Sequence, residues 1–275
     1  MEFQLPSLLV LIPILLGLIS SLNTLLWFLN WTWTNFLRPP KDLKGCYGSW
    51  ALVTGAADGI GRAISFELAN RGLNLVLLDR DAPKLETTAK EILHGHDVEV
   101  RTLVSDLCVD REDELVRKVR EVIEGLDVGV VINNAGTTHR DPLFFDEVDD
   151  RLVESIVRVN VEAATWVTKA AVPGMLERKR GVVVNIGSGS ASFLPSFPLF
   201  AVYSATKAYI HMFTRSISLE YKHHGIDIEC QPILDAFSPV ASAGFCANFN
   251  QELVDSQNHI ELEKEKISNL TCLAS

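Results

Sequence analysis

Short apolar segments alternate along this chain with longer segments of helical periodicity, and that alternation restricts the chain to one class of fold. The segments expected to be strands are 49–54, 73–78, 98–104, 128–133, 181–186 and 226–231. Those expected to be helices are 62–71, 82–93, 112–124, 149–176 and 203–223. Runs such as Val182-Val183-Val184 contain no polar position, as in strands that helices cover on both faces. The pattern predicts an α/β fold, a Rossmann-like doubly wound parallel sheet.

A glycine-rich turn joins the first predicted strand to the first predicted helix. Its glycines allow the backbone to turn tightly and to approach a pyrophosphate, whose charge the N-terminus of the helix stabilises. The residues of this turn that we expect to bind a dinucleotide are Gly55, Asp58, Gly59, Ile60 and Gly61. The second strand ends at Asp79 and Arg80, where a side chain that recognises the adenosine ribose is expected.

Polar residues also follow the fourth and fifth predicted strands. Asn133, Ala135 and Gly136 stand at the end of the fourth strand, and Ser188 follows the fifth by two residues. Taken singly, these residues are common in turns or in local bonds to the backbone. The carboxyl ends of parallel strands share one edge of the sheet, however, and ligands bind there. Their joint placement at this edge therefore favours a ligand-binding site.

Tyr203 and Lys207 are four residues apart in a segment expected to be helical, so their side chains share one face of the helix. A cation near a phenol favours the phenolate, which makes the phenol proton available to a reacting oxygen near neutral pH. The same spacing is common on solvated helices. It gains weight only because the segment begins where the other candidate residues gather.

The first 37 residues differ in character from the rest. No charged residue occurs from Phe3 to Leu37, and residues 8–29 are enough to cross the hydrocarbon core of a bilayer as a helix. Tryptophans 27, 31 and 33 cluster at the far end, as at a membrane interface. A cleavable signal peptide is the alternative, but the apolar run is too long and no Lys or Arg precedes it. Residues 1–37 are therefore predicted to be a membrane anchor.

Charge and cysteine content exclude several classes of function. Arg38, Lys41 and Lys44 follow the apolar run, so the positive-inside rule places the remaining chain in the cytosol. The net charge of −10 argues against nucleic acid as a partner. Five scattered cysteines without C-x-x-C spacing predict neither a disulfide framework nor a zinc site, and no metal is expected.

The motifs occur in an order and spacing that resemble the short-chain dehydrogenase/reductase family over about residues 48–232. They are Thr54-Gly55-x-x-x-Gly59-x-Gly61, Asn133-Asn134-Ala135-Gly136, a Ser after the fifth strand and Tyr203-x-x-x-Lys207. Within the family, the apolar N-terminus and segments 194–198 and 220–222 are similar to plant-type membrane-bound very-long-chain 3-oxoacyl-CoA reductases. Those enzymes are related to 17-beta-hydroxysteroid dehydrogenases and work in the endoplasmic reticulum during fatty acid elongation.

The resemblance implies roles for the catalytic residues. Tyr203 would protonate the substrate oxygen, and Lys207 would lower the pKa of the phenol and hold the nicotinamide ribose. Ser188 would orient the carbonyl, and Asn160 would support a proton relay through water. Ser188 is preferred to Ser190 because it lies three residues after Asn185, the register usual in the family.

The resemblance also implies a nicotinamide dinucleotide as cofactor. Asp106 would contact the adenine, and Asn133, Ala135 and Gly136 would line the cofactor cleft. The two residues at the end of the second strand favour different cofactors. Arg80 suits the 2′-phosphate of NADP(H), whereas Asp79 would accept a hydrogen bond from the free 2′-hydroxyl of NAD(H). The resemblance favours NADP(H), with NAD(H) as the alternative.

Without the resemblance, two of these residues have simpler interpretations. Asp106 would cap a helix, and Asn160 would be a solvated helix residue or a buried amide bonded to the backbone.

Three segments are thus expected: the anchor, a dinucleotide-binding domain over residues 45–235 and an atypical tail over residues 236–275. The tail is too short for the lid, helices and last strand of the family. Two hypotheses follow. The first is a reductase of a very-long-chain 3-oxoacyl-CoA or a steroid ketone, fixed by one span in the endoplasmic reticulum membrane. The second is an impaired, truncated isoform that binds intact subunits, or forms a homodimer, through the helices after Asp149 and Tyr203.

Overall fold

The computed structural model describes residues 5–33, 41–192 and 196–232 of the 275-residue chain. The chain divides into two compact units, residues 1–40 and 41–275. The predicted tail, residues 236–275, lies outside the described residues.

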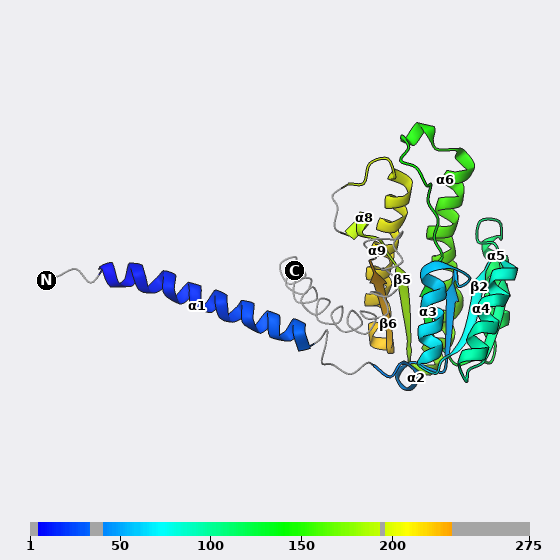
Figure 1. Cartoon of the computed structure of the whole chain (residues 1–275), viewed down its shortest axis with the longest axis horizontal. Helices are drawn as coiled ribbons and strands as arrows, with labels where there is room; N and C mark the ends of the chain where they lie inside the picture. Colours follow the sequence, from blue (N-terminus) through cyan, green and yellow to red (C-terminus); the bar gives the residue numbers. More distant parts are fainter. Residues whose placement is uncertain (1–4, 34–40, 193–195, 233–275) are drawn as a thin grey trace, which may run out of the picture. The chain divides into compact units, whose positions relative to one another are not determined.

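The first unit contains one long helix, α1 (Leu5–Thr32), drawn in blue in Figure 1. Leu11–Asn30 form a 20-residue stretch with a mean hydropathy of 1.9, and none of it is buried. At a rise of about 1.5 Å per residue, such a helix is about as long as the hydrocarbon core of a bilayer is thick. By length and composition α1 is able to span a membrane, and it is the only such helix in the described residues.

The second unit is built on a parallel sheet with the strand order β3-β2-β1-β4-β5-β6. The strands are β1 (Trp50–Thr54), β2 (Asn74–Asp79), β3 (Val100–Val104), β4 (Val128–Asn133), β5 (Gly181–Ile186) and β6 (Ile226–Gln231). The strand order reverses between β1 and β4, and ligands of such sheets bind in the crevice at this point. The predicted doubly wound parallel sheet is confirmed.

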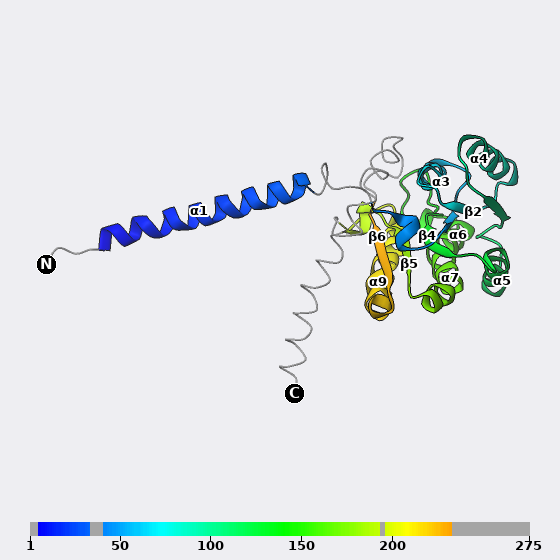
Figure 2. The same cartoon turned by 90° about the horizontal axis from the view of Figure 1, so that it is seen from below.

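Helices cover both faces of the sheet. Figure 2 shows α3 (Gly59–Asn70) and α4 (Ala82–Gly95) on one side, with α5 (Glu112–Ile123), α7 (Ala164–Arg178) and α9 (Ala201–Tyr221) on the other. Successive side chains of a strand point to opposite faces, so Leu75 and Leu77 of β2 join the core under α3 and α4. Val76 and Leu78 join the core under α5 and α7. The short elements are α2 (Leu43–Cys46), α8 (Gly189–Ser192), η2 (Phe145–Glu147) and η4 (Lys222–His224).

The predicted helix over residues 149–176 is interrupted in the structure. It consists of α6 (Asp150–Val157), a π-helical turn η3 (Arg158–Ala163) and then α7. A π-turn widens the helix by one residue and is often found at functional sites. Here it contains Asn160, whose contacts are described below.

Aspartates fix the first turns of two helices that begin at the carboxyl edge of the sheet, α3 and α4. Asp58 Oδ1 accepts the amide of Gly59 at 2.8 Å, and Asp81 Oδ1 accepts the amide of Lys84 at 3.1 Å. Each such cap stabilises its helix by about 1 kcal/mol. The caps place the N-termini of α3 and α4, with their free N–H groups, beside the ends of β1 and β2.

Candidate functional site

The glycine turn after β1 is held from the side by the end of β4. Asn134 Nδ2 donates to the carbonyls of Thr54 at 3.0 Å and Gly55 at 3.2 Å. The Thr54 hydroxyl oxygen accepts the amides of Asn134 and Ala135, both at 3.0 Å. A Cβ on Gly61 would lie 2.1 Å from the carbonyl oxygen of Gly55, so only glycine allows this close approach. The turn is thus formed before any ligand arrives.

A pocket of about 520 Å³, open to solvent, adjoins this turn at the switch between β1 and β4. Six of the predicted cofactor residues line it: Gly55, Asp79, Arg80, Asp106, Ala135 and Gly136. Asp106 uses Oδ1 to accept the amide of Cys108 at 2.9 Å, which orders the turn after β3. The pocket therefore gathers residues from the ends of four strands, β1, β2, β3 and β4.

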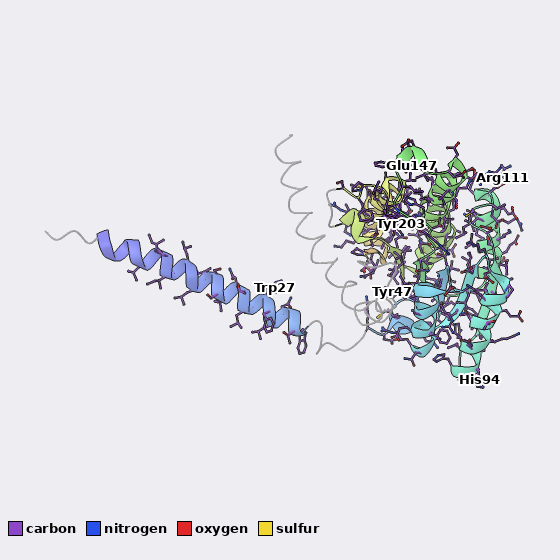
Figure 3. All side chains as sticks on the ribbon, turned by 45° about the horizontal axis from the view of Figure 1, so that its top comes forward. Trp27, Tyr47, His94, Arg111, Glu147 and Tyr203 are labelled. Atoms are coloured by element: carbon purple, nitrogen blue, oxygen red, sulfur yellow. The ribbon has the colours of Figure 1, made fainter. Side chains whose placement is uncertain are left out.

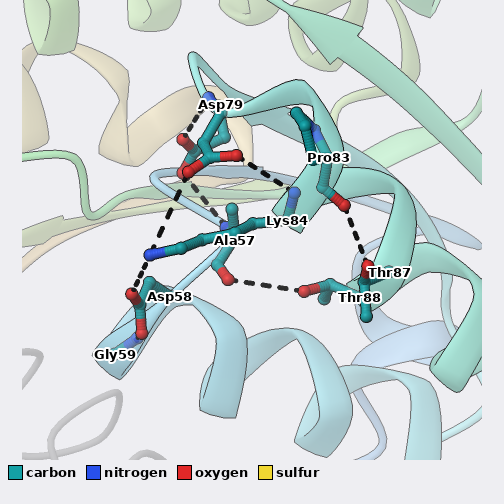
Figure 4. A network of polar contacts seen from close by, with 9 residues as sticks. Ala57, Asp58, Gly59, Asp79, Pro83, Lys84, Thr87 and Thr88 are labelled. Carbon is teal, nitrogen blue, oxygen red and sulfur yellow. Dashed lines mark hydrogen bonds and ion pairs between the residues drawn. The ribbon is translucent and has the colours of Figure 1, made fainter.

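Asp79 is held at the base of this pocket by two backbone amides. Its Oδ2 accepts the amide of Ala57, in the glycine turn, at 3.0 Å, and its Oδ1 accepts that of Asp81 at 3.1 Å. Figure 4 shows this carboxylate between the glycine turn and the start of α4. The side chain of Arg80 is exposed beside it. Asp79, at the end of β2, thus links the glycine turn to the residue that caps α4.

Tyr203 and Lys207 lie on the first two turns of α9. Tyr203 lies toward the same end of the domain as Glu147, whereas Tyr47 and His94 lie toward the opposite end (Figure 3). Lys207 is buried, 6% exposed, and its Nζ donates to the carbonyl of Ile186 at 2.8 Å. Burial lowers the pKa of Lys207 to about 8. Its Nζ is 5.8 Å from the centre of the Tyr203 ring.

The pKa of the Tyr203 phenol lies above its ordinary value, because burial raises it. The neighbouring Ser188 hydroxyl lowers this pKa in part. The lowering expected from Lys207 is therefore not what the structure shows, because the ammonium faces the end of β5 and makes its hydrogen bond there.

Two serines after β5 lie one behind the other. Ser188 is buried against Tyr203, and its Oγ accepts the hydroxyl of Ser190 at 2.9 Å and the amide of Ser190 at 3.2 Å. These two donors occupy the acceptor side of the Ser188 oxygen, which leaves its own proton to be donated. Of the two serines, Ser188 is the one in contact with the phenol.

Asn160, in the π-turn η3, joins the loop after β4 to α9. Its Oδ1 accepts the amide of Thr137 at 2.7 Å, and its Nδ2 donates to the carbonyl of Thr137 and the hydroxyl of Thr206, both at 3.0 Å. Thr206 in turn donates to the carbonyl of Tyr203 at 2.7 Å. The amide of Asn160 is thus a structural bridge behind the phenol.

Asn133 lies beneath the pocket and does not line it. Its Nδ2 donates to Asn185 at 2.7 Å and to Thr168 at 2.8 Å, and Asn185 donates to Thr214 at 2.8 Å. These side chains form a buried polar layer between the ends of β4 and β5 and the helices α7 and α9. The backbone ends that carry the candidate site rest on this layer.

Gly136 connects the pocket with the residues around Tyr203. It lines the pocket, and a Cβ built on it would lie 3.5 Å from Asn160 Oδ1 and 3.6 Å from Lys207 Nζ. An extended dinucleotide whose adenosine end occupied the pocket would run past Gly136 toward Lys207. The residues present therefore fit such a cofactor, and within the described residues no group of His, Cys, Asp and Glu could hold a metal ion.

The sequence predicted Tyr203, Lys207, Ser188 and Asn160 as catalytic residues, and that assignment stays a prediction. It missed the residues that hold them. Thr54, Asn134, Thr137 and Thr206 supply most of the bonds around the site. Thr54, Asn134 and Thr206 stand inside or beside the recognised motifs, and that adjacency is the one signal that could have indicated them.

Residues 49–232 match the family model described as short chain dehydrogenase, and the chain belongs to that family. A very-long-chain 3-oxoacyl-CoA reductase-like protein of Arabidopsis thaliana is 46% identical over 74% of this chain and 64% of its own. A human inactive hydroxysteroid dehydrogenase-like protein 1 is 39% identical over 74% of this chain and 61% of its own. The chain thus spans about three fifths of the length of these relatives.

A solved metagenomic short-chain oxidoreductase in complex with NADP superposes with a TM-score of 0.65 and 27% identity, over 77% of this chain and 93% of that one. The curated relatives are divided in kind. Some are named very-long-chain 3-oxoacyl-CoA reductases, and others are named inactive hydroxysteroid dehydrogenase-like proteins.

Proposed function

We propose that this protein is a membrane-anchored reductase that transfers hydride from NADPH to the carbonyl of a lipid substrate, a very-long-chain 3-oxoacyl-CoA of fatty acid elongation. The observation that carries the proposal is the Tyr203 phenol beside Ser188, with buried Lys207 on the next turn of the same helix and Gly136 of the pocket close to Lys207 Nζ. These are a proton donor, an orienting hydroxyl and a cation near the pocket that adjoins the glycine turn.

In the proposed reaction, the bound nicotinamide supplies the hydride that reaches the carbonyl carbon. Tyr203 gives its phenol proton to the carbonyl oxygen as the C=O bond becomes a C–OH, and Ser188 donates a hydrogen bond to the same oxygen. Lys207, fixed by its bond to the Ile186 carbonyl, would hold the ribose nearest the nicotinamide. Asn160 holds the loop after β4 and the start of α9 in place by its bonds to Thr137 and Thr206.

The substrate class is supported by the relatives named as 3-oxoacyl-CoA reductases and by α1. A helix able to anchor the domain at a bilayer shortens the path of a poorly soluble ketone to the cleft. We place the protein in the endoplasmic reticulum membrane, with the domain on the cytosolic side, because basic residues follow α1. A steroid ketone is the alternative substrate.

The test is NADPH oxidation by the purified full chain in detergent, with a long-chain 3-oxoacyl-CoA as substrate and a 17-ketosteroid in a parallel assay. Tyr203→Phe should abolish turnover while the affinity for NADPH is retained. Tyr209→Phe is the matched control, because Tyr209 lies on the same helix and is exposed, and its hydroxyl hydrogen-bonds to that of Thr165. Unchanged turnover in Tyr203→Phe would refute the proposed proton donor.

A second function is favoured by the relatives that are named inactive. In that case the protein would act by pairing with other subunits or with itself through the helices after Asp149 and Tyr203. The outer side of α9 carries exposed apolar residues, Tyr209, Met212 and Leu219. NADPH binding without turnover, together with a dimer in sedimentation that Met212→Glu dissociates, would support this function over the first.

A further inference from the structure

We propose that Lys84, on the first turn of α4, is the residue that makes this site prefer NADPH to NADH, by leaving Asp58 and binding the adenosine 2′-phosphate. The inference rests on the proposed use of a nicotinamide dinucleotide. It assigns a role to a lysine that lies outside every recognised motif and that does not line the pocket itself.

The position of Lys84 follows from the network in Figure 4. Its amide is fixed by Asp81, the cap of α4, at 3.1 Å, and its Nζ crosses to Asp58 Oδ2, in the glycine turn, at 2.8 Å. The ammonium therefore lies over the gap between the glycine turn and the start of α4. Asp79, at the base of the pocket, lies at the same gap, because it accepts the amide of Ala57 on one side and that of Asp81 on the other.

The charges at this gap explain why a cation is needed. Three carboxylates, Asp58, Asp79 and Asp81, surround it, and a phosphate monoester adds about two further negative charges. Arg80 and Lys84 lie beside these carboxylates, and Arg62 of α3 also acts on Asp58. A free 2′-hydroxyl meets no such repulsion, since Asp79 is able to accept a hydrogen bond from it. NADPH thus depends on the cations, and NADH does not.

Lys84 is able to change partner because its present ion pair is exposed. The side chains of Lys84 and Asp58 are 57% and 76% exposed, and such pairs contribute little in water. Asp58 raises the pKa of Lys84, so the ammonium is charged at neutral pH. A phosphate offers more charge and more acceptor oxygens than one carboxylate does. In the absence of a 2′-phosphate, Asp58 holds the ammonium at the place where it is needed.

The variants follow from this arrangement. Lys84→Met removes the cation and keeps the aliphatic length. Lys90→Met is the matched control, because Lys90 lies on the same helix, is 73% exposed and pairs with Glu86 in an equivalent ion pair. Asp58→Asn removes the competing carboxylate but keeps a residue that caps α3.

The experiment measures dissociation constants of the full chain for NADPH, NADH and the fragment 2′,5′-ADP by calorimetry, with circular dichroism to verify the fold of each variant. Lys84→Met should weaken NADPH and 2′,5′-ADP by at least about tenfold, the loss expected for a hydrogen bond to a charged group, and leave NADH unchanged. The slope of log Kd for NADPH against log salt should fall in this variant. Asp58→Asn should tighten NADPH, and Lys90→Met should change none of the constants.

Equal losses for both dinucleotides in Lys84→Met, or no loss for NADPH, would overturn the inference even in an enzyme that turns over. The same selective loss in a chain that shows no reductase activity would support the inference while the proposed function failed. Failure of the wild-type chain to bind 2′,5′-ADP would overturn the role of Lys84 directly.

Discussion

The two lysines next to the cleft lie in opposite surroundings. Lys84, beside β1 and β2, is exposed and paired with a carboxylate, which raises its pKa. Lys207, beside β5, is buried and bonded to a backbone carbonyl, and burial lowers its pKa to about 8. The half of the site around Lys84, called the binding half, therefore has exposed ion pairs that exchange partners at little cost. The half around Tyr203, called the catalytic half, is held by buried hydrogen bonds. One half is expected to adapt to its ligand, and the other to be set in advance.

The largest expected effect is that of Lys207→Met. We expect turnover to fall by about 10²- to 10⁴-fold, the range for loss of a group that supports proton transfer. Stability should move in the opposite direction, because folding places the ammonium in a buried site. The pKa of about 8 in the folded chain, against an ordinary 10.5, corresponds to about 3 kcal/mol at about 1.4 kcal/mol per pKa unit. Loss of the bond to Ile186 offsets part of this gain.

The sign of the pH dependence follows from the two protonation states. Below pH 8 the ammonium is charged in both the folded and the unfolded chain, so the wild type carries the full cost of its burial. Between about pH 8 and 10.5 the folded chain releases a proton that the unfolded chain keeps, and stability rises with pH. Urea titrations should show the advantage of Lys207→Met shrinking across this window. Lys84→Met is the control, and a similar pH profile there would contradict the comparison.

Gly61→Ala is expected to have the next largest effect. Its Cβ would lie 2.1 Å from the Gly55 carbonyl oxygen and 2.4 Å from Asn134 Nδ2, so the glycine turn must shift. We expect a loss of about 2 to 3 kcal/mol in the free energy of unfolding, with NADPH affinity lost as well. Gly59→Ala is the matched variant: Gly59 has φ +54° but no atom within 4 Å of the added Cβ, and about 1 kcal/mol is expected. Equal losses in the two variants would show that close approach is not what requires glycine.

Thr214→Val tests the buried layer beneath the site. It leaves Asn185 Nδ2 without its acceptor in the core, which should cost about 1 to 3 kcal/mol in the free energy of unfolding. Thr87→Val is the control from the binding half, since the Thr87 hydroxyl is exposed and bonds only to the Pro83 carbonyl of its own helix. A loss in Thr87→Val as large as that in Thr214→Val would remove the distinction between the two halves.

The fold and the cluster of candidate residues could be predicted because both depend on patterns local in sequence. Apolar strands, glycine turns and the spacing of Tyr203 and Lys207 are visible without tertiary contacts. The π-turn around Asn160 could not be predicted, because it depends on Thr137 and Thr206, which are distant in sequence. The same holds for Lys84, whose partner Asp58 is 26 residues away.

The orientation of the Asn133 side chain could have been predicted from the two-residue periodicity of its strand. Val131 belongs to the core under α5 and α7, and side chains two apart on a strand share a face. Asn133 is two residues beyond Val131, and its amide indeed bonds to Thr168 of α7. Strand periodicity therefore places this side chain in the core, where the motif alone suggested the cofactor cleft.

The smallest expected effect is that of Ser190→Ala, which is compared with that of Ser188→Ala. Ser188→Ala removes the hydroxyl in contact with the phenol and should lower turnover by about 10²-fold, as loss of one donor to a developing oxyanion does. Ser190→Ala removes one hydrogen bond, worth about 1 kcal/mol, to the Ser188 oxygen, so a loss of about fivefold is expected. In the double variant the loss should equal that of Ser188→Ala, because Ser190 acts only through Ser188. The measurement is kcat with a 3-oxoacyl-CoA. Additive losses in the double variant would mean that Ser190 contacts the substrate itself. The catalytic half would then be less preorganised than its buried bonds indicate.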